Sequence, residues 1–138
     1  MNKINYFIEQ NNVDTMSFDW GKLTITCSPE VNGSKQFSAG VVTMQPKKGH
    51  DRHNHPGAEE IIFVISGNGE QMIEDEKGKP IIKSVTPGST IYIPADRYHS
   101  TLNKGDTEMK VFVVYSPPGS ELTFKKFPDF KLIKAIQN

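Results

Sequence analysis

The sequence is poor in cysteine, has no surplus of charge of either sign and contains no long apolar run. Its single cysteine, Cys27, excludes an internal disulfide framework. No run of 18 apolar residues occurs, so we expect no membrane span. Sixteen basic and sixteen acidic residues give zero formal net charge, which argues against a nucleic-acid partner. The N-terminal residues lack the apolar core and small-residue cleavage site of a secretory signal, so we expect a cytoplasmic protein.

Helical periodicity is also nearly absent, and short β-branched and aromatic runs bounded by Gly, Pro, Asn and Asp take its place. Seven such runs with a turn signal roughly every ten residues predict an all-β sandwich or barrel. A chain of 138 residues is long enough for one domain with its own core, so we expect a single domain over 1–138. We place its barrel core at about 20–116, an N-terminal arm at 1–19 and a C-terminal tail at 117–138. The predicted strands are 23–27, 36–44, 60–66, 69–74, 81–85, 90–93 and 110–115.

The two ends are expected to be short helical or extended segments. Ile4, Phe7 and Ile8 have helical spacing near the N-terminus. Near the C-terminus, Pro128 is suited to the first turn of a short helix that would carry Phe130 and other apolar residues on one face.

Two predicted strands, 61–65 and 111–115, are apolar at both odd and even positions. An antiparallel sheet with one face in water should alternate between apolar and polar residues. Either these strands are covered on both sides within the domain, or their outer face meets another subunit. We therefore expect a homodimer.

All four histidines lie between residues 50 and 99, and two of them stand in a short acidic segment with Glu60. His53 and His55 are two residues apart, so on an extended chain both imidazoles face one side. Glu60 is an odd step further, but a turn at 56–57 would return it to the same interior. His99 lies in a second segment. Three imidazoles and one carboxylate suit one divalent transition metal, Mn, Fe, Co, Ni, Cu or Zn, with open positions for water or substrate.

These two segments resemble the two motifs of the cupin superfamily. The first family motif is Gly, His-x-His, three or four residues, Glu, six residues and Gly. The second is Gly, five residues, Pro-x-Gly, two residues, His, three residues and Asn. The matching residues are His53, His55, Glu60 and Gly67 in the first motif, and Gly88, Pro94, His99 and Asn103 in the second.

The chain departs from this pattern at two turn positions. The leading Gly of the first motif would fall at Lys47, although the chain has Gly49, and position 96 is Asp where the family usually has Gly. The resemblance covers about residues 36–116. It implies a jelly-roll β-barrel, and by carry-over it implies that His53, His55, Glu60 and His99 are the metal ligands.

Several neighbouring residues compete for roles at this site. Glu59 is the alternative carboxylate, but counting back from Gly67 selects Glu60, which then shares an inward face with Ile62 and Val64. The remaining polar candidates each have a plainer interpretation. We expect His50 to be a solvated loop side chain, Asn103 to bond nearby backbone, and Arg52 and Tyr98, the nearest acid or base candidates, to point outward.

The resemblance identifies a fold more sharply than a reaction, since this fold supports many unrelated activities. We expect a metal-dependent enzyme of isomerase or lyase type that acts on a small oxygen-rich molecule such as a sugar, sugar acid or keto-acid. A bound divalent ion would polarise a carbonyl or carboxylate oxygen of that molecule. The alternatives are an Fe- or Mn-dependent dioxygenase or oxalate-decarboxylase-like oxidoreductase, and a non-enzymatic small-ligand binding or sensor module.

Overall fold

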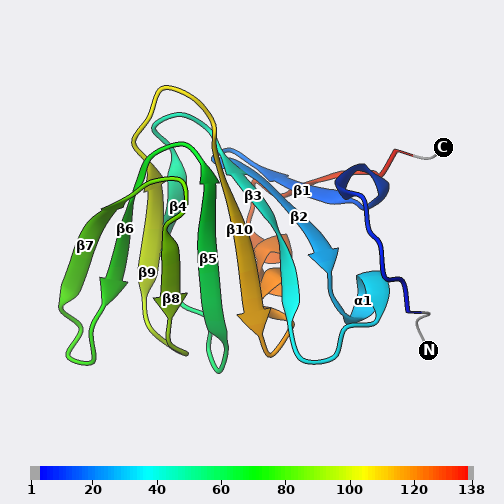
Figure 1. The fold of residues 1–138 in the computed structure, drawn as a ribbon, viewed down its shortest axis with the longest axis horizontal. Helices are drawn as coiled ribbons and strands as arrows, with labels where there is room; N and C mark the ends of the chain where they lie inside the picture. The colour runs from blue at the N-terminus through cyan, green and yellow to red at the C-terminus, as the bar shows by residue number, and fades with distance from the viewer. Residues whose placement is uncertain (1–3, 137–138) are drawn as a thin grey trace.

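Two antiparallel sheets face each other in the computed structural model, which describes residues 4–136 (Figure 1). The seven-stranded sheet has the order β11-β1-β2-β3-β10-β5-β8, and the four-stranded sheet has the order β4-β9-β6-β7. The strands of the large sheet are β11 (Lys131–Ile133), β1 (Thr15–Phe18), β2 (Gly21–Cys27), β3 (Ser38–Met44), β10 (Met109–Ser116), β5 (Glu59–Ser66) and β8 (Thr90–Ile93). The strands of the small sheet are β4 (Gly49–His53), β9 (His99–Asn103), β6 (Gly69–Glu74) and β7 (Pro80–Val85).

The predicted all-β class and jelly-roll barrel are confirmed. Each of the seven predicted strands is present, and the bounds of β6 and β8 match the prediction. Four further strands, β1, β4, β9 and β11, were not among the predicted ones. Strands β1 and β11 lie outside the range of 20–116 and extend the large sheet beyond β2.

The helices are short and lie outside the sheets. They are the 3-10 helix η1 (Gln10–Asn12), the helix α1 (Pro29–Asn32) and the 3-10 helix η2 (Ser120–Lys126). The Oγ of Ser28 accepts a hydrogen bond from the backbone N–H of Val31, which caps the start of α1. No helix within residues 4–136 combines the length and the hydropathy needed to cross a membrane.

The C-terminal helix predicted from Pro128 is wrong. Residues 131–133 instead form the edge strand β11, in which Leu132 pairs with Met16 and Ile133 pairs with Thr15. An apolar pattern of so few residues fits a strand as well as a helix, and here pairing with β1 decides the outcome. The helical spacing near the N-terminus is not realised either, because the chain is irregular from residue 4 to η1.

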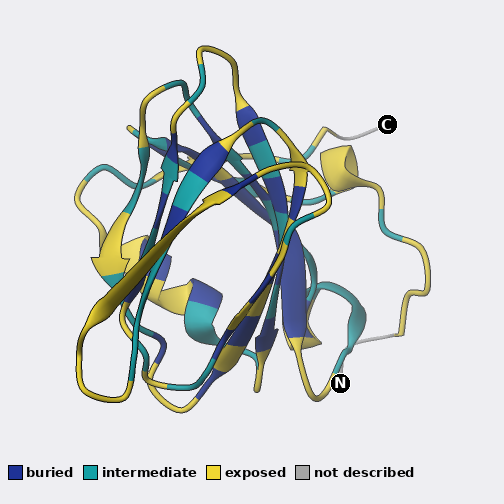
Figure 2. Cartoon of the chain, turned by 60° about the vertical axis from the view of Figure 1, so that its left-hand side comes forward, coloured by how far each residue is buried: buried dark blue, intermediate teal, exposed yellow. Residues whose placement is uncertain are grey.

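The core lies between the two sheets and is built mainly from alternate residues of six strands of the large sheet, β1, β2, β3, β5, β8 and β10 (Figure 2). In β5, Ile62 and Val64 are buried while Ile61, Phe63 and Ile65 are each at least 43% exposed. The strand therefore alternates in burial although its sequence does not alternate in hydropathy. The sequence allows two explanations for such a strand: burial on both sides within the domain, or contact with another subunit. No part of the described chain buries these three side chains, so the first explanation does not apply to them.

Candidate metal centre

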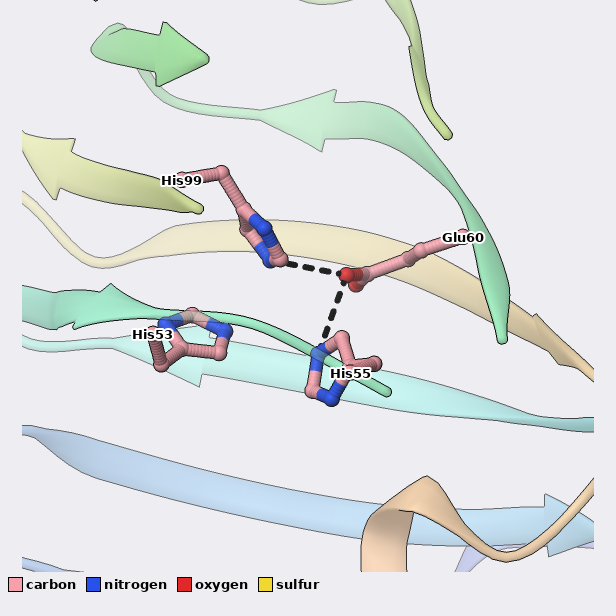
Figure 3. A group of neighbouring side chains, drawn as sticks. All are labelled: His53, His55, Glu60 and His99. Atoms are coloured by element: carbon pink, nitrogen blue, oxygen red, sulfur yellow. Dashed lines mark ion pairs between the residues drawn. The ribbon is translucent and has the colours of Figure 1, made fainter. Parts of the chain in front are cut away.

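The four side chains of the predicted metal set converge in the barrel interior (Figure 3). His53 ends β4, His55 follows it, Glu60 lies in β5 and His99 begins β9. One nitrogen or oxygen atom from each lies within 4.8 Å of those from the other three. His55, Glu60 and His99 are at most 5% exposed. Two strands of the small sheet and one of the large sheet thus present donor atoms to a single point.

Local irregularities of the backbone produce this convergence. Within the pairing of β4 with β9, His53 lies opposite His99 and His50 lies opposite Thr101, so three steps on β4 match two on β9. This is a β-bulge, which restores His50 and His53 to the same face. Gly57, in the turn that follows His55, has φ of 76°, a value that glycine adopts without strain.

Backbone carbonyl groups orient two of the imidazoles. The Nδ1 of His53 lies 2.6 Å from the carbonyl oxygen of Asp51, and the Nδ1 of His99 lies 2.9 Å from that of Arg97. In each case Nδ1–H donates to the carbonyl, which leaves Nε2 as a lone-pair donor for a cation. Hydrogen bonding of the second ring nitrogen is the usual way in which proteins orient metal-binding histidines.

Three buried polar atoms at this point have no hydrogen-bond partner among the described residues: the Nε2 of His55, the Nε2 of His99 and the Oε1 of Glu60. The Oε1 lies 3.2 Å from the first nitrogen and 3.1 Å from the second. An ion about 2.1 Å from each donor separates neighbouring donors by roughly 3.0–3.4 Å. The spacing therefore fits a shared cation, which would satisfy all three atoms at once.

Burial sets the protonation of these groups. It lowers the pKa of His53 from 6.5 to about 2, and the neighbouring His50 and His99 add to this effect. Burial alone would raise the pKa of Glu60, but contacts with His55 and His99 outweigh it, and the pKa is lowered. A neutral imidazole at His53 and an anionic carboxylate are the protonation states in which these groups bind metal.

Aromatic side chains close the space beside the four residues. His50 stacks on Trp20 with ring centroids 5.2 Å apart and lies 3.7 Å from the ring of His53. Phe124 of η2 is 3% exposed, and its ring centroid lies 4.9 Å from that of His50. The cavity that remains has a volume of only about 30 Å³. It has room for about one water molecule beside an ion.

Comparison with known proteins decides the family. A family model described as "Cupin domain" matches residues 40–115, which is more than half of the chain. The chain belongs to the cupin domain family.

The first curated relatives that the chain matches are longer proteins. A germin-like protein of Morus alba is 36% identical over 70 residues, which are 51% of this chain and 34% of that protein. The chain spans between about a third and a half of the length of the first curated relatives it matches.

Solved structures share the fold. The oxalate decarboxylase of Lactobacillus farciminis, in a formate complex, superposes with a TM-score of 0.71 at 22% identity, covering 90% of this chain and 34% of that one. The oxalate decarboxylase of Bacillus subtilis, studied for its Mn(II) centres, superposes with a TM-score of 0.65 at 23% identity, covering 84% of this chain and 28% of that one.

The two residues that depart from the cupin pattern share a left-handed backbone conformation. Lys47 and Asp96 have φ of 62° and 70°, and they are the only residues other than glycine with positive φ in the described chain. Both occupy positions where the family pattern has glycine, which adopts this region without steric cost. The carboxylate of Asp96 accepts a hydrogen bond from the backbone N–H of Gly57, which ties the two motifs together beside His55.

The polar residues that neighbour the four predicted ligands mostly lie where the sequence predicts. Glu59 is exposed and accepts a hydrogen bond from the hydroxyl of Tyr92, while Glu60 faces the interior. Arg52 stacks on the ring of Tyr98, 3.8 Å from its centroid, on the outside of the small sheet. Neither of these two reaches the four-residue cluster.

Asn103 bonds nearby backbone, as predicted. It is fully buried, its amide nitrogen lies within 3.2 Å of the carbonyl oxygens of Met44, Gln45 and Thr107, and its Oδ1 accepts from Gly105 N–H. It is therefore a buried link between two backbone segments, 44–45 and 105–107.

The expectation for His50 is wrong. It is a half-buried residue of β4 that lines the metal cavity. A spacing of three residues from His53 implies opposite faces of a regular strand, but the bulge places both side chains on the same face. Burial lowers its pKa from 6.5 to about 4. Phe124 was missed altogether, since no local pattern shows that a residue of the C-terminal segment enters the barrel.

Proposed function

We propose that this cupin binds one divalent transition metal through His53, His55, Glu60 and His99. The observation that carries the proposal is the set of three buried donor atoms, each without a hydrogen-bond partner and each facing the others. Three imidazoles and one carboxylate favour Mn, Fe, Co, Ni, Cu or Zn over Mg or Ca, which prefer all-oxygen sites.

Elemental analysis of protein purified without added metal tests this proposal. We expect about one equivalent of metal in the wild type and strong loss in His99→Ala and Glu60→Gln. Glu59→Gln is the matched control, because it removes the adjacent carboxylate on the outer face. Wild-type occupancy in His99→Ala and Glu60→Gln would refute the ligand assignment.

We further propose that the protein is an enzyme acting on a small oxygen-rich molecule, of isomerase or lyase type. A divalent ion bound at this point supplies Lewis-acid polarisation of a carbonyl or carboxylate oxygen. Phe124 and Trp20 keep bulk water from the site. The cavity of about 30 Å³ is smaller than any organic substrate, so entry requires η2 to move, and a small keto-acid requires less movement than a sugar does.

His50 is the group placed to exchange a proton with a substrate in this site. It lines the cavity with His53 and His99, and a neutral imidazole at this position can accept a proton from a substrate. We expect His50→Gln to retain metal and to lose turnover of any keto-acid that the wild type converts. Full turnover in this variant would exclude the role.

The second candidate is an Mn- or Fe-dependent oxidoreductase resembling oxalate decarboxylase. The shared fold and the Mn(II) centres named for the Bacillus subtilis enzyme favour it. Incubation with oxalate and with small keto-acids, in air and without oxygen, separates the two. Conversion of keto-acids with redox-inert ions and without oxygen supports the first candidate, and conversion of oxalate supports the second. Ligand-dependent thermal stabilisation without turnover would instead support a binding or sensor module.

We also propose that the outer face of the large sheet forms a homodimer interface. Ile61, Phe63, Ile65 and Tyr92 lie on this face and are between 43 and 55% exposed. Contiguous exposed apolar residues of this kind mark interaction surfaces. Sedimentation should give a dimer for the wild type and a monomer for Phe63→Lys. Ile82→Lys, on β7 of the other sheet, is the control that should remain dimeric. A monomeric wild type would overturn this proposal.

A further inference from the structure

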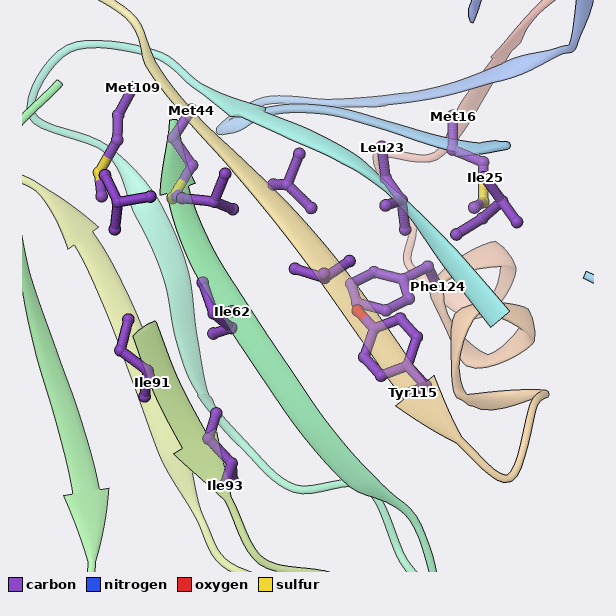
Figure 4. Packing of buried hydrophobic residues seen from close by; sticks show 14 of the residues in the cluster. Met16, Leu23, Ile25, Met44, Ile62, Ile91, Ile93, Met109, Tyr115 and Phe124 are labelled. Carbon is purple, nitrogen blue, oxygen red and sulfur yellow. The ribbon is translucent and has the colours of Figure 1, made fainter. Parts of the chain in front are cut away.

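A second and much larger cavity lies at the other end of the large sheet. Its volume is about 770 Å³, within the range of small-molecule binding sites, and it is lined by residues of β1, β2, β11, α1 and η2. Apolar side chains that include Met16, Ile25 and Leu132 form much of its wall. Figure 4 shows Met16 and Ile25 at the end of the core beside η2. The same helix divides the two cavities, since Phe124 lines the metal cavity and Glu121 lines this one.

Glu121 is an unusual group to find in such a wall. It is 5% exposed, and its Oε2 accepts hydrogen bonds from the Oγ of Ser38 at 2.9 Å and from the backbone N–H of Gly119 at 3.0 Å. Across residues 4–136, no lysine, arginine or histidine forms an ion pair with it. Buried carboxylates are rarely left without a countercharge, because the desolvation of the anion is costly.

The other charged groups of the cavity do not supply that countercharge. Three carboxylates, those of Asp14, Glu30 and Glu121, line the cavity together with one ammonium group, that of Lys125. Asp14 pairs with Lys134 at 3.7 Å. Lys125 is exposed on η2, so its charge is solvated. The cavity is therefore an apolar space with a buried carboxylate, that of Glu121, in its wall.

We propose that this cavity binds a small, mainly apolar molecule that carries a protonated amine, with the ammonium group paired to Glu121. The apolar body would cover Met16, Ile25 and Leu132, and the ammonium group would supply the missing countercharge. A charge-assisted hydrogen bond to a buried carboxylate is stronger than one between neutral groups. The site is separate from the metal centre, so binding requires no metal and does not depend on the proposed enzymatic function.

Three probes that share a phenyl group and four methylenes but differ in charge test the proposal: 4-phenylbutylamine, 4-phenylbutanol and 5-phenylvalerate. The readout is the NMR spectrum of protein labelled with methyl-¹³C methionine, recorded in EDTA. Met16 lines this cavity and Met44 lines the metal cavity, so the two resonances report on the two sites separately. We expect the amine to shift the Met16 resonance saturably and to leave that of Met44 in place. The alcohol should bind at least about tenfold more weakly, and the carboxylate more weakly still.

Three variants fix the assignment. Glu121→Gln keeps an oxygen that can accept from Ser38 and should weaken the amine at least about tenfold. Leu132→Trp fills the cavity from an exposed strand and should abolish binding, which provides a second test if Glu121→Gln fails to fold. Lys125→Ala is the control and should bind the amine as well as the wild type does. The proposal is overturned if the amine leaves Met16 unshifted, if the carboxylate binds as tightly, or if Glu121→Gln binds the amine like the wild type.

Discussion

Replacing Phe124 with alanine should loosen the barrel and open the metal centre. The ring is 3% exposed and packs against Phe18, His50 and Phe127, with centroids 4.9–6.0 Å apart. Its removal leaves a void of roughly 80 Å³, which alone costs about 2 kcal/mol at ~24 cal/mol per Å³. With the lost transfer free energy of the ring, the free energy of unfolding should fall by about 3–5 kcal/mol.

The same change should speed the removal of metal by a chelator. We expect EDTA to reach the cavity of the wild type only when η2 opens locally, because the ring of Phe124 packs beside the site and stabilises the closed form. A loss of even 1.4 kcal/mol from that form raises the open population about tenfold, so extraction should be at least about tenfold faster.

Urea unfolding and the rate of metal transfer to excess EDTA measure the two effects. Phe127→Ala is the matched control, because this ring belongs to the same aromatic group but is 38% exposed and does not line the metal cavity. It should cost about 1 kcal/mol and leave extraction unchanged. If Phe124→Ala cost under about 1 kcal/mol and released metal at the wild-type rate, η2 would not be the barrier.

Three further changes test the local physics. Lys47→Gly should raise the free energy of unfolding by about 1 kcal/mol in urea titrations, because the strain of φ at 62° outweighs the exposed contacts of the ammonium group with the carbonyl of Lys104 and with Asp106. Asp96→Gly should gain less, because its carboxylate accepts from the backbone N–H of Gly57 between the two motifs. The lowered pKa values of His50 and His53 mean that, without metal, the unfolded chain binds more protons below pH 6.5. Stability in EDTA should therefore fall as the pH drops from 6.5 toward 4, by about 1 kcal/mol per unit for each histidine, and less steeply in His50→Gln; a flat profile would contradict this. Asn103→Asp places an acceptor against three carbonyl oxygens and should cost about 3 kcal/mol or more, measured by thermal and urea unfolding.

The sequence was most informative where periodicity and turn residues agree. Strands such as β6 and β8 are bounded by glycine and proline, and their predicted limits match the structure. It was least informative at the ends, where β1 and β11 are short and β11 forms only by pairing with β1. Local pattern carries no information about such a long-range pair, so Pro128 misleadingly indicated a helix.

At the site, spacing identified the four converging side chains because the two motifs fix their positions relative to turns. Spacing failed for His50, since a bulge adds one residue to β4 and changes which face that side chain occupies. The closure by Phe124 depends on where η2 packs, which is set by tertiary contacts with Phe18 and His50. Neither a bulge nor a distant packing partner can be recognised from the hydrophobic periodicity of the sequence.

The pairing of β11 with β1 makes the two ends of the fold depend on each other. Proteolysis before Lys131 would remove β11 and leave β1 at the edge of the sheet with unpaired N–H and C=O groups. Strands with an unpaired edge form hydrogen bonds with other chains, so cleavage in the tail should cause aggregation that begins at residues 15–18. A fusion protein or cleavage site is therefore safer in the 75–79 hairpin than near the C-terminal strand.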